Sequence, residues 1–170
     1  VILLLIQVGG MGVVTIAVAI FMFAGKRIGL KQRWVMQESI SAPQVGGIVR
    51  MTGFILKTAF LIEGVGVLLL ALRFCPQFGL GRGLWYAVFH SVSAFCNAGF
   101  DLMGVNSPFS SLTDYVGDPL VSNVIAFLII IGGVGFLTWN DIREHKLHFR
   151  RYRLQSKLIL TTTLALILTG

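Results

Sequence analysis

Long apolar segments separated by polar connections organise this chain. Predominantly apolar residues occupy positions 1–24, 53–74 and 120–139, and a further apolar segment runs through 155–170. A membrane-spanning helix needs about 20 apolar residues. We therefore predict three spanning helices and the start of a fourth. Because both ends of the sequence fall inside apolar segments, we expect it to be an internal part of a longer protein.

The composition is that of a membrane protein. Charged residues make up only 12% of the 170 residues and apolar residues 55%, with a mean hydropathy of +0.83. A soluble domain carries roughly 25% charged residues, so the expected fold class is an all-α membrane protein. The net charge of +7 would suggest nucleic acid binding in a soluble protein. Here most charges lie in the connections, so no nucleic acid partner is expected.

The connections differ in charge. Positions 26–57 carry six basic residues and one acid, positions 143–157 carry the same excess, and positions 75–117 carry one basic residue and two acids. Connections rich in lysine and arginine face the cytoplasm in membrane proteins. The two basic connections are therefore predicted to lie inside the cell and the middle one outside.

Orientation and length together predict a helix that enters the membrane without crossing it. The stretch 84–96 lies between two spans whose orientations alternate only if this stretch does not cross. Its apolar part, positions 85–95, is about 16 Å long at 1.5 Å per residue, roughly half the hydrocarbon thickness. We expect a re-entrant pore helix followed by a filter at 97–100. The expected parts are the last span of one repeat (1–25), a cytoplasmic connection (26–52), a complete span–pore loop–span repeat (53–140), a second cytoplasmic connection (141–154) and the start of the next repeat (155–170).

The sequence FHSVSAFCNAGF, from Phe89 to Phe100, carries the candidate site. A helix that ends at membrane depth exposes backbone carbonyls, which is tolerated only where they line water or ions. Ion selectivity filters are built this way. Gly99 permits a positive φ that aims successive carbonyls into one column, and the negative end of the helix dipole favours a cation there. The alternative is an amphipathic helix outside the membrane with no role in conduction.

Glu63 lies in the middle of the predicted span 53–74. An intramembrane carboxylate indicates a functional site by default, but a buried carboxylate also needs partners. We expect it to accept hydrogen bonds from His90, Ser91 or Ser93, and these four residues to support the pore helix. An intramembrane enzyme that uses Glu63 or His90 is the alternative from another class. It is disfavoured because no nucleophile, base and orienting acid form a recognisable set.

An internal repeat connects the first and third apolar segments. The pattern I-x-x-G-G-x-G-x-x-T occurs at positions 6–15 and again at 129–138, an offset of 123 residues. No βαβ context accompanies the glycines, so they are not expected to bind a nucleotide. Small residues inside spans permit close helix packing. The predicted packing or hinge positions are Gly9, Gly10, Gly12, Gly132, Gly133 and Gly135.

Two further pairs of residues are not expected to form sites. Cys75 and Cys96 are too few for a disulfide or metal framework, and Cys96 is expected to fill space beside the filter, as a buried free cysteine does. His145 and His148 have a spacing that could hold a metal. They lie in a basic connection with few carboxylates, so a solvated helix face is the preferred interpretation.

These motifs together resemble the second repeat of the Ktr/Trk/HKT superfamily of potassium transporters. The resemblance rests on the stretch 89–102, on the Asp118-Pro119 start of the third segment and on the glycines at 132–136. It extends over essentially the whole chain. Within the superfamily, the residues of these motifs are most similar to those of the Ktr type of bacterial membrane protein.

The resemblance implies a multi-pass protein of the bacterial plasma membrane that takes up potassium and is not an enzyme. Four concatenated span–pore–span repeats would surround one pore, and each would contribute one filter strand with a central glycine. Potassium would be the substrate, bound near Gly99, with no covalent cofactor. The implied partners are a second copy in a homodimer, a cytosolic ring of nucleotide-binding regulatory subunits and membrane lipid. A sodium-permeable member of the superfamily is the alternative. The filter residues that the resemblance assigns are Asn97, Ala98, Gly99 and Phe100.

Overall fold

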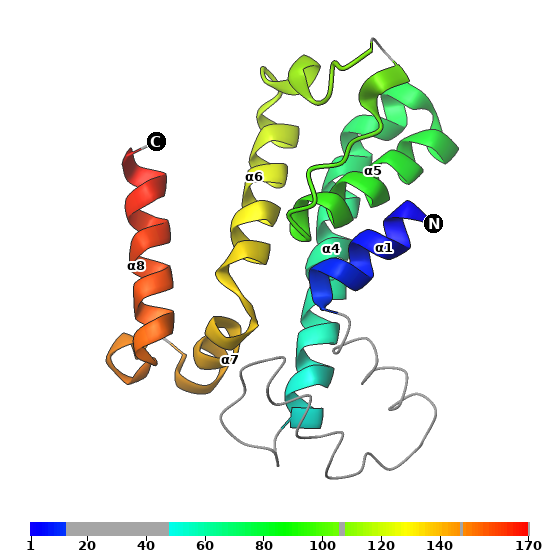
Figure 1. Ribbon diagram of the computed structural model, residues 1–170. Coiled ribbons are helices and arrows are strands. Elements are labelled where there is room, and N and C mark those ends of the chain that lie inside the picture. Colours follow the sequence, from blue (N-terminus) through cyan, green and yellow to red (C-terminus); the bar gives the residue numbers. More distant parts are fainter. Residues whose placement is uncertain (13–47, 106–107, 147, 170) are drawn as a thin grey trace. The chain divides into compact units, whose positions relative to one another are not determined.

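The computed structural model describes residues 1–12, 48–105, 108–146 and 148–169. Every regular element in these residues is helical (Figure 1), which confirms the all-α class there. The chain divides into two compact units, Val1–Gly132 and Gly133–Gly170. The α-helices are α1 (Ile2–Met11), α4 (Ile48–Phe78), α5 (Leu80–Phe95), α6 (Pro119–Val134), α7 (Phe136–His145) and α8 (Leu154–Thr169), and the short 3₁₀ turns are η2 (Met103–Val105), η3 (Thr113–Tyr115) and η4 (Phe149–Arg151).

Helix α4 is the span predicted at 53–74. Its part Thr52–Phe78 is the one helix in the described residues that is long and apolar enough by itself to cross a membrane. Helices α6 and α7 reach that length only if they are counted together as one broken span. Helix α8 is apolar and begins one residue before the segment predicted at 155–170. The expected connection 26–52 lies mostly outside the described residues, and α4 begins inside it.

Pro76 does not end the span, which runs beyond the bound at 74 predicted for it. It lies inside α4, which continues to Phe78. Proline inside a helix removes the hydrogen bond of its missing N–H and crowds the carbonyl four residues earlier, but little helix follows it here. The last turn is closed by the Gly79 N–H, which donates to the Cys75 carbonyl at 3.0 Å. Gly79 then reverses the chain with a φ of 81°.

Helix α5 folds back alongside α4 (Figure 1) and begins earlier than the pore helix predicted at 84–96. The residues from Leu80 to Gly83 lie outside the predicted pore helix, and two of them are glycines, which are weak helix formers. These residues are helical because α5 packs closely against α4. A Cβ added at Gly83 would lie 2.5 Å from the Cα of Cys75, so only glycine lets the two backbones meet.

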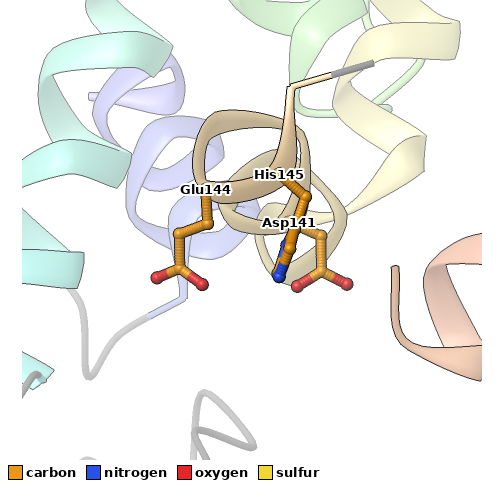
Figure 2. Close-up of side chains that lie close together, drawn as sticks. All are labelled: Asp141, Glu144 and His145. Carbon is orange, nitrogen blue, oxygen red and sulfur yellow. The ribbon is translucent and has the colours of Figure 1, made fainter. Parts of the chain in front are cut away.

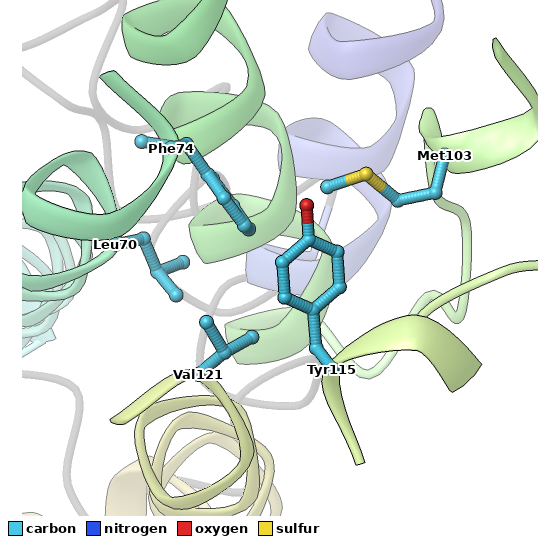
Figure 3. Packing of buried hydrophobic residues seen from close by; sticks show 6 residues of the cluster. Leu70, Phe74, Met103, Tyr115 and Val121 are labelled. Carbon is cyan, nitrogen blue, oxygen red and sulfur yellow. The ribbon is translucent and has the colours of Figure 1, made fainter. Parts of the chain in front are cut away.

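A buried cluster holds the connection after α5 against the two helices (Figure 3). The ring of Phe74 lies at its centre, with ring centroids 5.4 Å from Tyr115 and 5.6 Å from His90. The Tyr115 hydroxyl donates to the Gln77 side chain at 2.9 Å. The position of the pore-helix histidine is thus fixed by packing. The cluster consists of Leu70, Phe74, Ala87, Met103, Tyr115 and Val121.

The start of α6 confirms the predicted Asp118-Pro119 helix start. Pro119 is the first helical residue. The Asp118 carboxylate accepts hydrogen bonds from the N–H groups of Leu120 at 3.0 Å and Val121 at 3.3 Å. An acidic side chain at this position satisfies amides that have no partner inside the helix.

Both copies of the glycine pattern end a helix at the same position. Helix α1 ends just before Gly12, which has a φ of 79°, and α6 ends just before Gly135, which has a φ of 83°. Within the spans expected at 1–24 and 120–139, the helices therefore end at two of the glycines that were predicted as packing or hinge positions, because a left-handed residue interrupts a right-handed helix. Helix α7 then runs into the connection expected at 141–154.

Candidate functional site

Helix α5 ends in a tight turn inside the stretch singled out from the sequence. The Ala98 N–H donates to the Ser93 carbonyl at 2.9 Å, and the Asn97 N–H donates to the Ala94 carbonyl at 3.1 Å. These two bonds are the pair that defines a Schellman motif, with Asn97 as its left-handed residue. The φ of Asn97 is 54°, and that of Gly99 is 73°. Two left-handed residues in three positions reverse the chain at the end of the helix.

After this turn the chain runs back along α5. The Ser93 hydroxyl donates to the Phe100 carbonyl at 2.6 Å, and the Leu102 N–H donates to Nε2 of His90 at 3.3 Å. Successive residues of this return segment (Phe100 to Leu102) therefore pair with earlier positions of the helix. The end of α5 and the segment that follows it therefore lie side by side.

The two ring nitrogens of His90 have different partners. Nδ1 lies 2.7 Å from the Tyr86 carbonyl, which can only accept, so Nδ1 carries the proton. Nε2 then accepts from the Leu102 N–H. A neutral imidazole has one donor and one acceptor, and this environment uses both. His90 is 2% exposed. Its buried side chain therefore joins α5 to the return segment through hydrogen bonds.

The two glycine repeats flank the end of α5. A Cβ added at Gly10 of α1 would lie 3.1 Å from the Cα of Cys96 and closer to its side chain. A Cβ added at Gly132 of α6 would lie 2.9 Å from the carbonyl carbon of Phe95 and closer to its oxygen. Both positions are packing contacts that larger residues cannot make. A Cβ added at Gly9, by contrast, would meet nothing within 4 Å in the described residues, so the packing or hinge role predicted for Gly9 stays a prediction.

The Asn97 side chain also contacts α6. Its amide nitrogen lies 3.3 Å from the Ile129 carbonyl and donates to it. The side chain of the first predicted filter residue is therefore directed at the neighbouring span. Its amide adds a hydrogen bond to the glycine contact that already joins the end of α5 to α6.

Glu63 is buried as expected, but its carboxylate has a different partner. The side-chain amide of Gln7 in α1 donates to both carboxylate oxygens, at 2.9 and 3.1 Å. Ser91 donates to the backbone carbonyl of Glu63 at 2.7 Å. The expectation that pore-helix hydroxyls would reach the carboxylate was wrong, because Ser91 meets the backbone and Ser93 is used by the return segment. Glu63 instead links α4 to α1.

A cavity of about 280 Å³ borders the return segment within the first compact unit. Its lining combines polar groups of α5 and the return segment with apolar groups of α6. Because this side of the return segment is not filled by side chains, hydrogen bonds to α5 carry its placement. The lining includes His90, Ser93, Gly99, Phe100, Ile125 and Ile129.

The profile of the TrkH family, described as a cation transport protein, matches residues 2–167. The chain belongs to the TrkH family. It is 43% identical over 162 residues to the Ktr system potassium uptake protein B of Bacillus subtilis (strain 168), which covers 95% of this chain and 35% of that protein. It is 37% identical over 169 residues to the potassium/sodium uptake protein NtpJ of Enterococcus hirae, covering 99% of this chain and 36% of that protein.

A third relative of this TrkH chain is the Ktr system potassium uptake protein B of Vibrio alginolyticus. The two are 34% identical over 167 residues, which is 98% of this chain and 36% of that protein. The chain thus spans about a third of the length of these relatives. Its place among transporters confirms the resemblance and the membrane location, and it disfavours an enzyme built on Glu63 or His90.

An ion pair in the first unit of the TrkH chain was missed in the sequence. Arg73 of α4 donates to the Asp118 carboxylate at 2.5 Å. This hydrogen bond holds the pKa of Asp118 below its usual range. Burial raises the pKa of the nearby Tyr115 phenol. Spacing offers no signal for the pair, since the two residues are 45 positions apart.

Asp141, in the second unit, was also missed. It is fully buried, and it accepts from the Ser156 hydroxyl at 2.6 Å and from the Arg153 N–H at 3.1 Å. Its carboxylate also lies 3.5 Å from the Arg153 guanidinium. These contacts tie α7 to the start of α8. In the sequence, Asp141 lies next to a basic connection, and nothing there indicates that its side chain is buried.

Three side chains of α7 project to the same side (Figure 2), and their ligand atoms lie within 4.8 Å of one another. This group contains His145 but not His148, so the histidine pair considered from the sequence does not form a shared site. Asp141 is already bonded to α8, and Glu144 accepts from Asn140 at 3.0 Å. A cation would have to displace these partners beside Arg153, which opposes metal binding.

Proposed function

We propose that this chain is part of the pore-forming membrane subunit of a Ktr/Trk-type potassium uptake system, and that residues 97–100 form one strand of its selectivity filter. One observation carries the proposal. A helix whose last two turns are buried ends in a turn with left-handed residues at Asn97 and Gly99, and the chain then retraces the helix. That arrangement places backbone carbonyls at the negative end of a helix.

The transport mechanism follows from this arrangement. A potassium ion that enters the filter must exchange its water for oxygens, and backbone carbonyls supply them. The C-terminal end of α5 contributes partial negative charge where the cation loses water. Gly99 has a left-handed φ, which a residue with a Cβ adopts reluctantly, and this φ sets the direction of the neighbouring carbonyls. No covalent chemistry is required of Glu63 or His90.

The proposed topology places the protein across the plasma membrane as consecutive span–pore loop–span repeats. Residues 53–140 would form one repeat, and the flanking parts would belong to its neighbours. The equivalent left-handed glycines at 12 and 135 support repetition of one unit. The basic connections would face the cytoplasm. The remaining filter strands would come from other parts of the longer protein.

Cytosolic and membrane partners are part of the proposal. Relatives named as proteins of a Ktr system support a protein that works with others. We expect a ring of nucleotide-binding regulatory subunits on the cytoplasmic side and a homodimer of the membrane protein. The positive charge of positions 143–157 suits acidic protein surfaces or anionic lipid.

A sodium-permeable transporter of the same superfamily is the second candidate. The relative named potassium/sodium uptake protein, at 37% identity, favours keeping it. The two candidates differ in the ratio of potassium to sodium uptake by the full-length protein. This ratio is measured in cells that lack other uptake systems.

Gly99→Ser in the full-length protein tests the filter assignment. Its φ of 73° is strained for a residue with a Cβ, at a cost of about 1–2 kcal/mol. The preference for potassium over sodium is expected to fall about fivefold or more, with uptake of sodium kept. Gly104→Ser is the matched control, because a Cβ at Gly104 meets nothing within 4 Å and its φ is ordinary. Unchanged selectivity of a normally expressed Gly99→Ser protein would remove Gly99 from the filter.

A further inference from the structure

The hydrogen bond between Ser93 and Phe100 fixes the direction of one carbonyl. The Ser93 hydroxyl lies 2.6 Å from the Phe100 oxygen, and Ser93 is 3% exposed. A carbonyl that accepts from the helix behind it points toward that helix. Its oxygen is therefore not free to turn toward an ion while this hydrogen bond is kept.

The two preceding residues are held differently. The Ala98 N–H donates to the Ser93 carbonyl and so closes the helix cap. Gly99 has a left-handed φ and open space around its Cβ position. The chain thus changes direction at Gly99, next to the residue that Ser93 holds.

Packing does not enforce this change of direction. The cavity beside the return segment is lined by Gly99, Phe100 and Ser93 themselves, together with Ile125 and Ile129 of α6. Space on that side would let the Phe100 peptide rotate if the hydrogen bond were absent. The serine hydroxyl is buried and has one acceptor, so its bond is maintained at little cost.

We infer, on the basis of the proposed function, that Ser93 sets where the ion-facing carbonyls of this strand end. It holds the Phe100 carbonyl against α5, and the column stops at Gly99. Ser93 touches no ion and is a positioning residue for cation selectivity. Loss of its hydroxyl frees the Phe100 carbonyl, which then joins the column as a mobile ligand. A mobile ligand closes around the smaller sodium ion, so discrimination falls.

Ser93→Ala in the full-length protein tests this inference, by uptake of potassium and of sodium in cells without other uptake systems. The potassium-to-sodium ratio is expected to fall about fivefold, the equilibrium worth of one neutral hydrogen bond, while the amount of protein in the membrane stays the same. Ser93→Thr, which keeps the hydroxyl, is expected to restore the ratio. A general loss of helix stability would not be selective between the two ions.

Ser122→Ala is the matched control. The Ser122 hydroxyl also donates to a backbone carbonyl, that of Tyr115 at 2.9 Å, but away from the return segment. It is expected to keep the wild-type ratio. If Ser93→Ala does not accumulate, Ser93→Cys replaces it with the same expectation, because a thiol is a weak donor. A wild-type ratio in Ser93→Ala or Ser93→Cys overturns the inference and leaves potassium uptake intact. Absence of potassium uptake by the wild-type protein overturns the proposed function instead.

Discussion

The contact between Gly132 and the end of α5 makes Gly132→Ala the sharpest test of how the site is held. An added Cβ would lie 2.9 Å from the carbonyl carbon of Phe95, closer still to its oxygen and 3.2 Å from the Asn97 amide nitrogen. Carbon atoms pack at about 3.5–4.0 Å, so α5 and α6 must separate by roughly 1 Å. The obstructing atoms of Phe95 are backbone and cannot rotate away.

The expected magnitude follows from two opposing effects. Overpacking of a tight contact costs typically about 1–3 kcal/mol. Alanine in place of glycine within a helix regains about 0.5–1 kcal/mol. We therefore expect Gly132→Ala to lower the free energy of unfolding by about 1–2 kcal/mol and to disturb the first filter position. Gly64→Ala is the control, because its Cβ would meet nothing within 4 Å, and a gain of about 0.4–1 kcal/mol is expected there.

Thermal unfolding of the full-length protein in detergent measures both variants, and ion uptake measures the effect on the filter. Gly132→Ala should unfold at a lower temperature than the wild type, and Gly64→Ala at an equal or higher one. The order of the two variants is the decisive observation. If Gly132→Ala were as stable as Gly64→Ala, the close approach of α6 to α5 would be refuted.

Two further predictions concern buried and exposed carboxylates. Glu63→Ala leaves the Gln7 amide without its acceptor and should destabilise the protein by about 1–3 kcal/mol. Glu63→Gln keeps an acceptor and should lose less stability and less potassium uptake; equal, wild-type behaviour of both would contradict the link to Gln7. The lowered pKa of Asp118 means that its pairing with Arg73 stabilises the fold above the ordinary aspartate value of about 3.9 and is lost as the pH falls through the lowered value. Asp118→Asn should therefore lower the melting temperature at pH 7 and converge on the wild type only once the pH has fallen below the lowered pKa, and a difference that persists at that pH would count against the ion pair.

Apolar patterning predicted where the helices lie but not where they break. Helices α4 and α8 follow from the apolar segments, and the start of α6 follows from an acidic cap before proline. The continuation of α4 past Pro76 depends on the bond from Gly79 to Cys75, which no propensity describes. The break before Gly135 depends on one dihedral angle. Glycine inside an apolar segment is compatible with both a packing contact and an interruption.

The candidate site was predicted as a location but not as a network. The sequence indicated that Asn97 and Gly99 follow a short helix, and their left-handed φ values agree with a chain reversal. The partner of Glu63 could not be predicted, because Gln7 lies 56 positions away on another helix. Asp141 gave no signal, since its burial arises from the packing of α7 on α8. Contacts between elements distant in the sequence depend on tertiary structure alone.

The two glycines that flank the end of α5 bring α1 and α6 into close contact with it. A side-chain contact absorbs small displacements by changing rotamer, but Gly10 and Gly132 have no side chain to rotate. Gly132 meets the backbone of Phe95, and Gly10 meets the short side chain of Cys96. A tilt of α1 or α6 would therefore move the end of α5 as well, because no side chain of Gly10 or Gly132 can rotate to absorb it. A displacement of α6 would therefore reach Asn97 directly, through the Gly132 contact with Phe95 and the hydrogen bond from Asn97 to Ile129.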